Sequence, residues 1–141
     1  AAGRFGPERV PAGSWSVFAS DREAGWGGRL PPSIVVEAGR EARAVIDAQV
    51  IAGSLTCDDA AGQPLAEESV TVLRVDEYRP GVTHSFLLTT RKTDANGRLS
   101  LQLLEGAYAL HRGPYVPGQT SPATVPLTWT SSGPLNERVQ L

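Results

Sequence analysis

Hydrophobic and polar residues alternate with a period of two along several stretches of this chain. Leu99, Leu101 and Leu103 are separated by polar residues, and Tyr108 and Leu110 alternate with alanines. Successive side chains of a β-strand point to opposite faces, so this pattern predicts strands with one face in a core.

Short apolar runs bounded by turn residues, with 15 glycines and 11 prolines spread along the chain, predict nine strands. In the fourth strand Val70 and Val72 share a face, and Arg74 is the next position on it. The segment Glu37–Ala48 also fits a helix, although its residues from Ala42 onward fit a strand equally well. The predicted strands are Trp15–Ser20, Ser33–Glu37, Ala42–Leu55, Ser69–Asp76, His84–Arg91, Arg98–Leu103, Ala107–His111, Thr124–Thr130 and Glu137–Leu141.

The sequence Asp94-Ala95-Asn96-Gly97 stands between two predicted strands. Asn-Gly tolerates positive φ, which a type I′ turn requires, so a tight hairpin is predicted here. Turns at this spacing along an all-β chain predict a β-sandwich.

The chain also contains an internal repeat with an offset of 93–94 residues. Residues 1–48 resemble the second half of a module, and residues 49–141 resemble one whole copy. The matched segments are Gly3-Arg4-Phe5 with Gly97-Arg98-Leu99, Val10–Val17 with Leu103–Leu110, Ile34–Val36 with Leu127–Trp129, Gly39 with Gly133, and Val45 with Val139.

Half a sandwich exposes strand edges and an apolar face, and exposed edges pair with other strands. Three interpretations of residues 1–48 follow. The missing half was removed from the chain, it is donated by another chain, or the segment folds back on the second module as extra strands.

The full copy has an ordered set of short motifs. They are Val50–Leu55 leading to Asp58, then Gly62-Gln63-Pro64-Leu65, Val70-Thr71-Val72, Thr93–Leu99, and Leu104–Leu110. This order resembles the carboxypeptidase regulatory-like family, the transthyretin-like repeats of large bacterial exported proteins. The resemblance implies an all-β, prealbumin-like (Ig-like) antiparallel β-sandwich, with one complete module preceded by the C-terminal half of a second. It also implies an extracellular or cell-surface location.

Each motif has an expected role in folding. Leu65 is expected to anchor its turn to the core, and Asp94 to hold the next turn through its own backbone. Gly106 lets the chain enter the following strand tightly. Tyr108, and Trp15 in the first copy, are expected to pack inward with a polar tip on a backbone carbonyl.

Charge, cysteine content and hydrophobicity exclude or argue against several classes of protein. The chain has 141 residues, a net charge of −2 and one cysteine. A single cysteine cannot form an internal disulfide, and a near-neutral charge argues against nucleic-acid binding. No apolar run approaches the length of a membrane span.

The candidate chemical residues do not form known catalytic patterns. His84 and His111 lack zinc-site spacing, and Cys57 lies beside two acids that disfavour a thiolate. The Asp94 turn lacks the distal ligands of a calcium loop, and Lys92 is expected to be solvated rather than cross-linked. We expect no enzyme activity, no catalytic residue, no cofactor and no metal.

Trp26 is the one candidate contact residue. Glycines flank it in a predicted loop, which would leave its ring open to stack on a sugar or to insert into a partner. The alternative is a ring folded over the end of the sandwich.

The combined interpretation is a non-enzymatic structural or adhesion module, acting as a rigid spacer or interaction domain. One alternative is a subunit of an extracellular fibre, in which strands of a neighbouring chain complete the first module. Another is a carbohydrate-binding module. The expected partners are proteins, or further copies of the chain, that pair with the strand edges of residues 1–48, and a glycan at Trp26.

Overall fold

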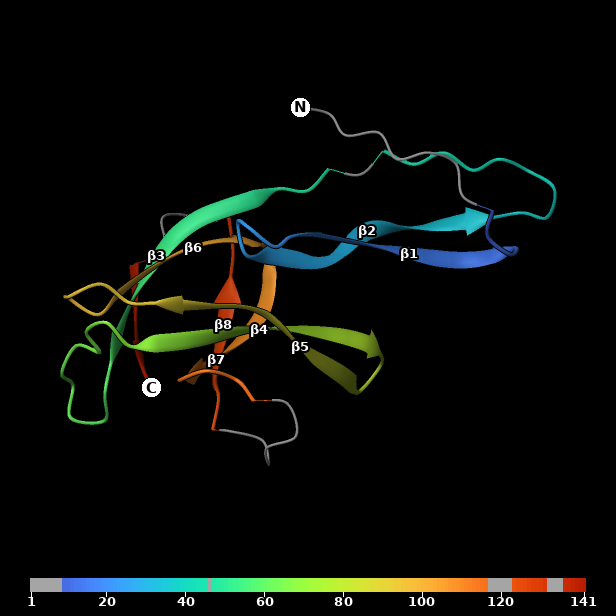
Figure 1. Cartoon of the computed structure of the whole chain (residues 1–141). Helices are drawn as coiled ribbons and strands as arrows, with labels where there is room; N and C mark the ends of the chain where they lie inside the picture. The colour runs from blue at the N-terminus through green and yellow to red at the C-terminus, as the bar shows by residue number, and fades with distance from the viewer. Residues whose placement is uncertain (1–8, 46, 117–122, 132–135) are drawn as a thin grey trace.

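The computed structural model describes residues 9–45, 47–116, 123–131 and 136–141, and within these residues the protein is all-β (Figure 1). All nine predicted strands are present. They are β1 (Gly13–Asp21), β2 (Trp26–Val36), β3 (Val50–Asp58), β4 (Ser69–Arg79), β5 (Val82–Lys92), β6 (Arg98–Leu104), β7 (Gly106–Arg112), β8 (Val125–Trp129) and β9 (Asn136–Gln140).

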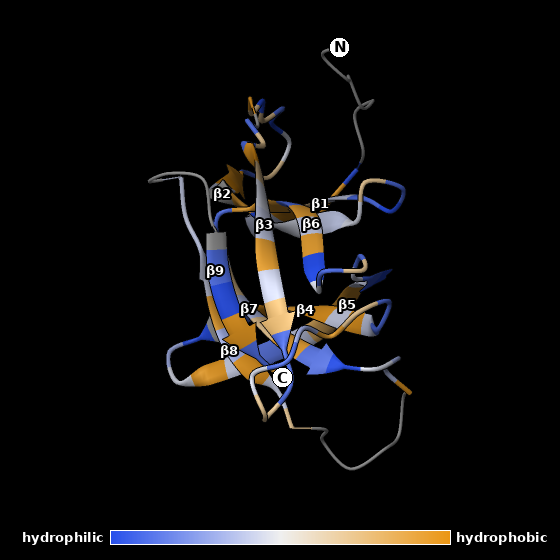
Figure 2. Cartoon of the chain, turned by 90° about the vertical axis from the view of Figure 1, so that its left-hand side faces the viewer, coloured by the Kyte–Doolittle hydropathy of each residue, from blue (hydrophilic) through white to orange (hydrophobic). Residues whose placement is uncertain are grey.

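Strands β3–β9 form a sandwich of two sheets, ordered β6-β3-β9 and β5-β4-β7-β8, while β1 and β2 pair as a separate antiparallel hairpin. Figure 2 shows β9, β3 and β6 side by side as one layer, with β4, β5, β7 and β8 in the other. Most strand pairs are antiparallel. The pair β3 and β9, which are the first and last strands of the sandwich, is parallel.

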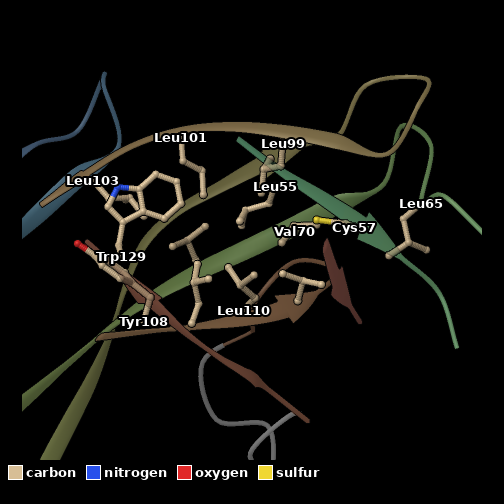
Figure 3. Close-up of a cluster of buried hydrophobic side chains, with 13 residues drawn as sticks. Leu55, Cys57, Leu65, Val70, Leu99, Leu101, Leu103, Tyr108, Leu110 and Trp129 are labelled. Atoms are coloured by element: carbon tan, nitrogen blue, oxygen red, sulfur yellow. The ribbon is translucent and has the colours of Figure 1, made fainter. Parts of the chain in front are cut away.

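The core lies between these two sheets (Figure 3). Leu99, Leu101 and Leu103 point inward from β6 as their alternation predicts, and Leu65 anchors its turn to the same core. Tyr108 and Trp129 are its largest buried side chains. The hydrophobic effect of this apolar interior holds the sheets together.

The prediction of one solvent-facing side for β4 is wrong. Val70, Thr71, Val72, Leu73 and Arg74 are all buried. β4 is the strand between β5 and β7, with a register irregularity after Val72, and on its second face Thr71 contacts Thr90 of β5 and the backbone at Gly113. The buried Thr71 hydroxyl is satisfied, because it lies 3.0 Å from the Thr90 hydroxyl and donates to the Gly113 carbonyl at 2.8 Å.

The predicted Asn-Gly hairpin is also wrong, because the turn after Asp94 connects two sheets: β5 belongs to one and β6 to the other. The Gly97 amide donates to the Asp94 carbonyl at 3.0 Å, and Gly97 has φ +73° whereas Asn96 has no positive φ. These features describe a type I turn followed by a left-handed glycine. The Asp94 carboxylate accepts the Asn96 and Arg98 amides as predicted, which lowers its pKa.

The predicted strand Ala42–Leu55 is correct only from Val50 onward, and β3 then continues to Asp58. Residues 42–45 and 47–49 are neither helix nor strand. Their repeat counterpart is β9, which is a strand because it pairs with β3. Among the described residues, no strand stands in that position beside residues 42–45.

Candidate interaction surface

The hairpin β1–β2 repeats the strand pairing of β7–β8. In the first hairpin Gly13 pairs with Val36, and in the second Gly106 pairs with Trp129. Both residues of the second pair lie 93 positions after their counterparts in the first. The next two pairs of each hairpin keep the same offset. The internal repeat is therefore present in the backbone structure as well as in the amino-acid sequence. The match of Gly3-Arg4-Phe5, and that of Gly39 with Gly133, involve residues outside the described ranges.

The local geometry of the two hairpins agrees in two further details. Gly13 has φ +150° and Gly106 has φ +149°. Two residues later, the Trp15 indole N–H donates to the Pro11 carbonyl at 2.9 Å, and the Tyr108 hydroxyl donates to the Leu104 carbonyl at 2.6 Å. Each bond reaches back four residues, so the predicted polar-tip contact is confirmed in both copies.

The burial of equivalent side chains differs between the two hairpins. Tyr108 is 1% exposed whereas Trp15 is 38% exposed, so the prediction that Trp15 packs in a core is wrong. The physical reason is the neighbours: β4 and the β6-β3-β9 sheet surround β7, whereas β1 pairs with β2 alone among the described strands. Without a second layer over this face, a two-stranded hairpin leaves the Trp15 ring partly exposed to solvent.

The repeat of pairing ends after Trp15. In the first hairpin Trp15 pairs with Ile34, but Val17 pairs with Leu30. Between these two pairs β2 has two more residues than β1, and this irregular stretch contains Pro31 and Pro32. Prolines lack the amide that a ladder needs and favour edge strands. The second hairpin also has a proline in its outer strand, Pro126.

A buried arginine of β4 lies where the hairpin meets the sandwich. The Arg74 guanidinium donates to the Tyr108 hydroxyl at 2.7 Å, to the Glu105 carbonyl at 3.0 Å and to Asp76 at 2.7 Å. It also lies 4.9 Å from the centre of the Tyr108 ring. Burial lowers the pKa of Arg74, but Asp76 and Tyr108 more than offset this effect and the net pKa is raised. For the Tyr108 hydroxyl, burial acts in the opposite direction and raises the pKa.

Two glycines of β2 let the hairpin approach this arginine. A Cβ added at Gly28 would lie 3.2 Å from Leu104 and 3.4 Å from the Arg74 guanidinium, and one at Gly27 would lie 3.1 Å from Leu88. The contacts at 3.2 Å and 3.1 Å are tighter than ordinary van der Waals distance, and the contact at 3.4 Å lies at its lower limit. The first hairpin is therefore seated directly on the sandwich at its turn end.

Side chains at the hairpin tip add to this joint. Phe18 and Phe86 make an edge-to-face contact with ring centres 5.2 Å apart, and Arg91 donates to the Glu23 carbonyl at 2.7 Å. Sequence reasoning did not identify Phe18 or the role of Arg74. An arginine within an alternating valine strand was the available signal for Arg74.

The structure corrects the position of Trp26. It is not in a loop but is the first residue of β2, and its side chain is half-buried. The two glycines after it serve the close packing described above rather than ring exposure. Trp26 borders a hollow of about 190 Å³ together with Phe18 and Phe86.

The other candidate chemical residues remain apart. Cys57 is fully buried, and burial, with a smaller effect of Asp58, raises the pKa of its thiol to about 11. His111 lies on β7 with Nδ1 3.3 Å from the Ala123 carbonyl, and Lys92 is exposed at the end of β5. The described residues contain no group of three or more potential metal ligands. In the same residues no helix is long and apolar enough to span a membrane.

No family model matches this chain, and no curated protein matches it. Among solved structures, it is similar to BcpA, the major pilin subunit of Bacillus cereus, with 17% identity and a TM-score of 0.40. The match covers 65% of this chain and 28% of the pilin subunit, so the chain spans less than a third of that protein. A similarity at this level does not establish a shared function.

Proposed function

We propose that this chain is a load-bearing β-sandwich module, a non-enzymatic spacer of an exported or cell-surface protein. The observation that carries the proposal is the parallel pairing of β3 with β9, the first and last strands of the sandwich. Ser54–Asp58 pair in order with Asn136–Gln140. The surface location rests on the motif resemblance to repeats of exported proteins.

The pairing determines how tension acts on the module. Tension applied through the two ends of the sandwich pulls the start of β3 and the end of β9 in opposite directions. Because the strands are parallel neighbours, this force shears all their hydrogen bonds at once instead of breaking them singly. The core side chains Leu55, Cys57 and Val139 lie on the same two strands and oppose the sliding.

The joint with the first hairpin suits the same role. Arg74, Gly28 and the Phe18–Phe86 contact connect the two parts of the chain through packed groups. A packed joint transmits orientation along a stalk, whereas a flexible linker does not.

Single-molecule pulling with two attachment geometries tests the proposal. Handles at residues 49 and 141 shear the β3–β9 pair, and handles at residues 61 and 141 unzip the same pair from one end. We expect the shear geometry to unfold at a clearly higher force, because many bonds must break together. Equal unfolding forces in both geometries would contradict a load-bearing role.

A second candidate function is glycan binding beside Trp26. The hollow next to Trp26 is lined by Phe18 and Phe86, and also by Asp21 and Arg22. Aromatic faces combined with charged groups suit the apolar and hydroxyl faces of a sugar. A glycan-binding assay on the intact chain and on Trp26→Ala tests it, with loss of binding in the variant expected. Binding that survives the substitution, or that is absent from the intact chain, would exclude this site.

A further inference from the structure

We propose that the first hairpin is one half of a second sandwich and docks a complementary half-module with the build of residues 50–96, supplied by the same polypeptide ahead of Gly3. The docking surface consists of the outer edge of β1 and the apolar face that includes Trp15 and Ile34. This inference concerns assembly and does not require the load-bearing role proposed above.

The repeat shows what this surface lacks. Six apolar residues of the first copy correspond to residues that the sandwich buries. The corresponding pairs are Val10 with Leu103, Trp15 with Tyr108, Val17 with Leu110, Ile34 with Leu127, Val36 with Trp129 and Val45 with Val139. All six members of the sandwich set are buried, and no member of the first set is.

Val45 gives the clearest example. It is 92% exposed, whereas Val139 is 6% exposed. Val139 is buried because β9 pairs with β3 and faces the core. An isolated, fully exposed valine is ordinary, but six exposed or half-buried apolar residues at positions that a known partner would cover mark a docking face.

The sandwich itself specifies the strand that would pair with β1. β4 runs antiparallel to β7, with Val72 opposite Leu110 and Arg74 opposite Tyr108. Applied to the first hairpin, this register places a β4-like strand antiparallel to β1, with its arginine position opposite Trp15. Main-chain hydrogen bonds along such an edge supply affinity, and alternate side chains supply specificity.

A second copy of this chain is a poor occupant. The strands that would be needed, β3, β4 and β5, are already paired within its own sandwich. Donating them would expose the core around Trp129 and Tyr108 in the donor. A preceding half-module has no such conflict, and it would meet the hairpin at a turn like that of Asp94–Gly97.

A hybrid chain tests the proposal directly. A second copy of residues 49–96 is joined ahead of Gly3, the repeat counterpart of Gly97, and the rest of the chain is kept to Leu141. We expect the amides along the outer edge of β1 to exchange at least ~10-fold more slowly than in the original chain. We also expect Trp15 fluorescence to shift to the blue and residues 42–45 to become a protected strand.

The matched control changes only the added copy. Val72→Pro and Arg74→Pro in that copy remove ladder amides from its β4 and should abolish the new protection of β1. β1 amides that exchange equally fast in the hybrid and in the original chain would overturn the proposal. Protection of β1 that appears in the original chain as its concentration rises would also overturn it, because the occupant would then be a second copy.

A measurement on the original chain does not depend on folding of the hybrid. The double variant Trp15→Ser, Val45→Ser should change the Tm by less than ~2 °C, since this face has no cover to lose. The matched variant Tyr108→Ser, Val139→Ser should lower the Tm far more or unfold the chain. A large loss of Tm in the first variant would show that the face is already buried, and the proposal would be wrong.

Discussion

The hairpins β1–β2 and β7–β8 have the same strand pairing at their first three pairs, the same positive-φ glycine and the same side-chain bond four residues back. They differ in what covers them. Local sequence therefore determines the geometry of each hairpin, whereas the surrounding strands determine how far its side chains are buried. Predictions that change equivalent positions in the two hairpins therefore test this account most sharply.

The largest difference is expected at the pair Trp129 and Val36. Trp129→Ala should destabilise the protein by about 3–5 kcal/mol, because it empties a fully buried site and removes the indole bond to Ile51. Val36→Ala should cost less than about 1 kcal/mol at its half-buried position. Urea unfolding curves of both variants measure this, and similar losses would break the comparison.

The next effect concerns the buried joint at Arg74. Arg74→Met should cost about 2–4 kcal/mol, because Asp76 and the Glu105 carbonyl lose their partner. The control Arg29→Met changes an exposed arginine of β2 and should stay within about 0.5 kcal/mol. Urea unfolding gives both values. If Arg74→Met matched its control, the arginine would not hold the joint.

A smaller effect is expected at the paired glycines. Gly106→Ala should cost about 1–3 kcal/mol, because its backbone is strained for an L-residue and its Cβ would clash with the bonded Arg74 guanidinium. Gly13→Ala has the same backbone strain, but its nearest atom is 4.0 Å away in Trp15. We expect Gly13→Ala to be the milder change by thermal unfolding. A reversed order would refute the packing difference.

The smallest effect concerns pH and belongs to the sandwich alone. The Arg98 and Asn96 amides lower the pKa of Asp94 below its unfolded value. Its contribution to stability is therefore complete above about pH 4 and is lost as the pH falls through the folded pKa. Asp94→Ala should flatten the acid side of the stability curve, measured by urea unfolding between pH 2 and 6 as an experimental range. An unchanged acid limb would contradict this role of Asp94.

The sequence was sufficient to predict the nine strands, because apolar alternation and turn residues are local signals. It also identified the inward positions of Leu99 and Tyr108, and the role of Asp94 in its turn. It could not identify which strands pair. The turn at Asp94–Gly97 has hairpin residues but changes sheets, and β4 has alternating residues but is buried on both sides.

The candidate surface was only partly predictable. The repeat pointed to an incomplete module, but an inward Trp15 follows only when a covering sheet is present. Trp26 was placed in a loop because of its glycines, which instead allow β2 to pack closely on Arg74 and Leu88. Residues 42–45 show the same limit, since a strand forms only where another strand accepts its hydrogen bonds.

Hydrogen exchange on the original chain measures whether the outer edge of β1 is open while the equivalent edge of β7 is covered. Alternate amides of an antiparallel strand point to one edge, so the outer-edge amides of β1 and the β4-facing amides of β7 can be compared position by position. Because β4 covers the edge of β7, we expect the β7 amides to exchange only on global unfolding. We expect the outer-edge amides of β1 to exchange at least ~100-fold faster. Equal protection of the two strands would show that β1 already has a partner and would contradict the account.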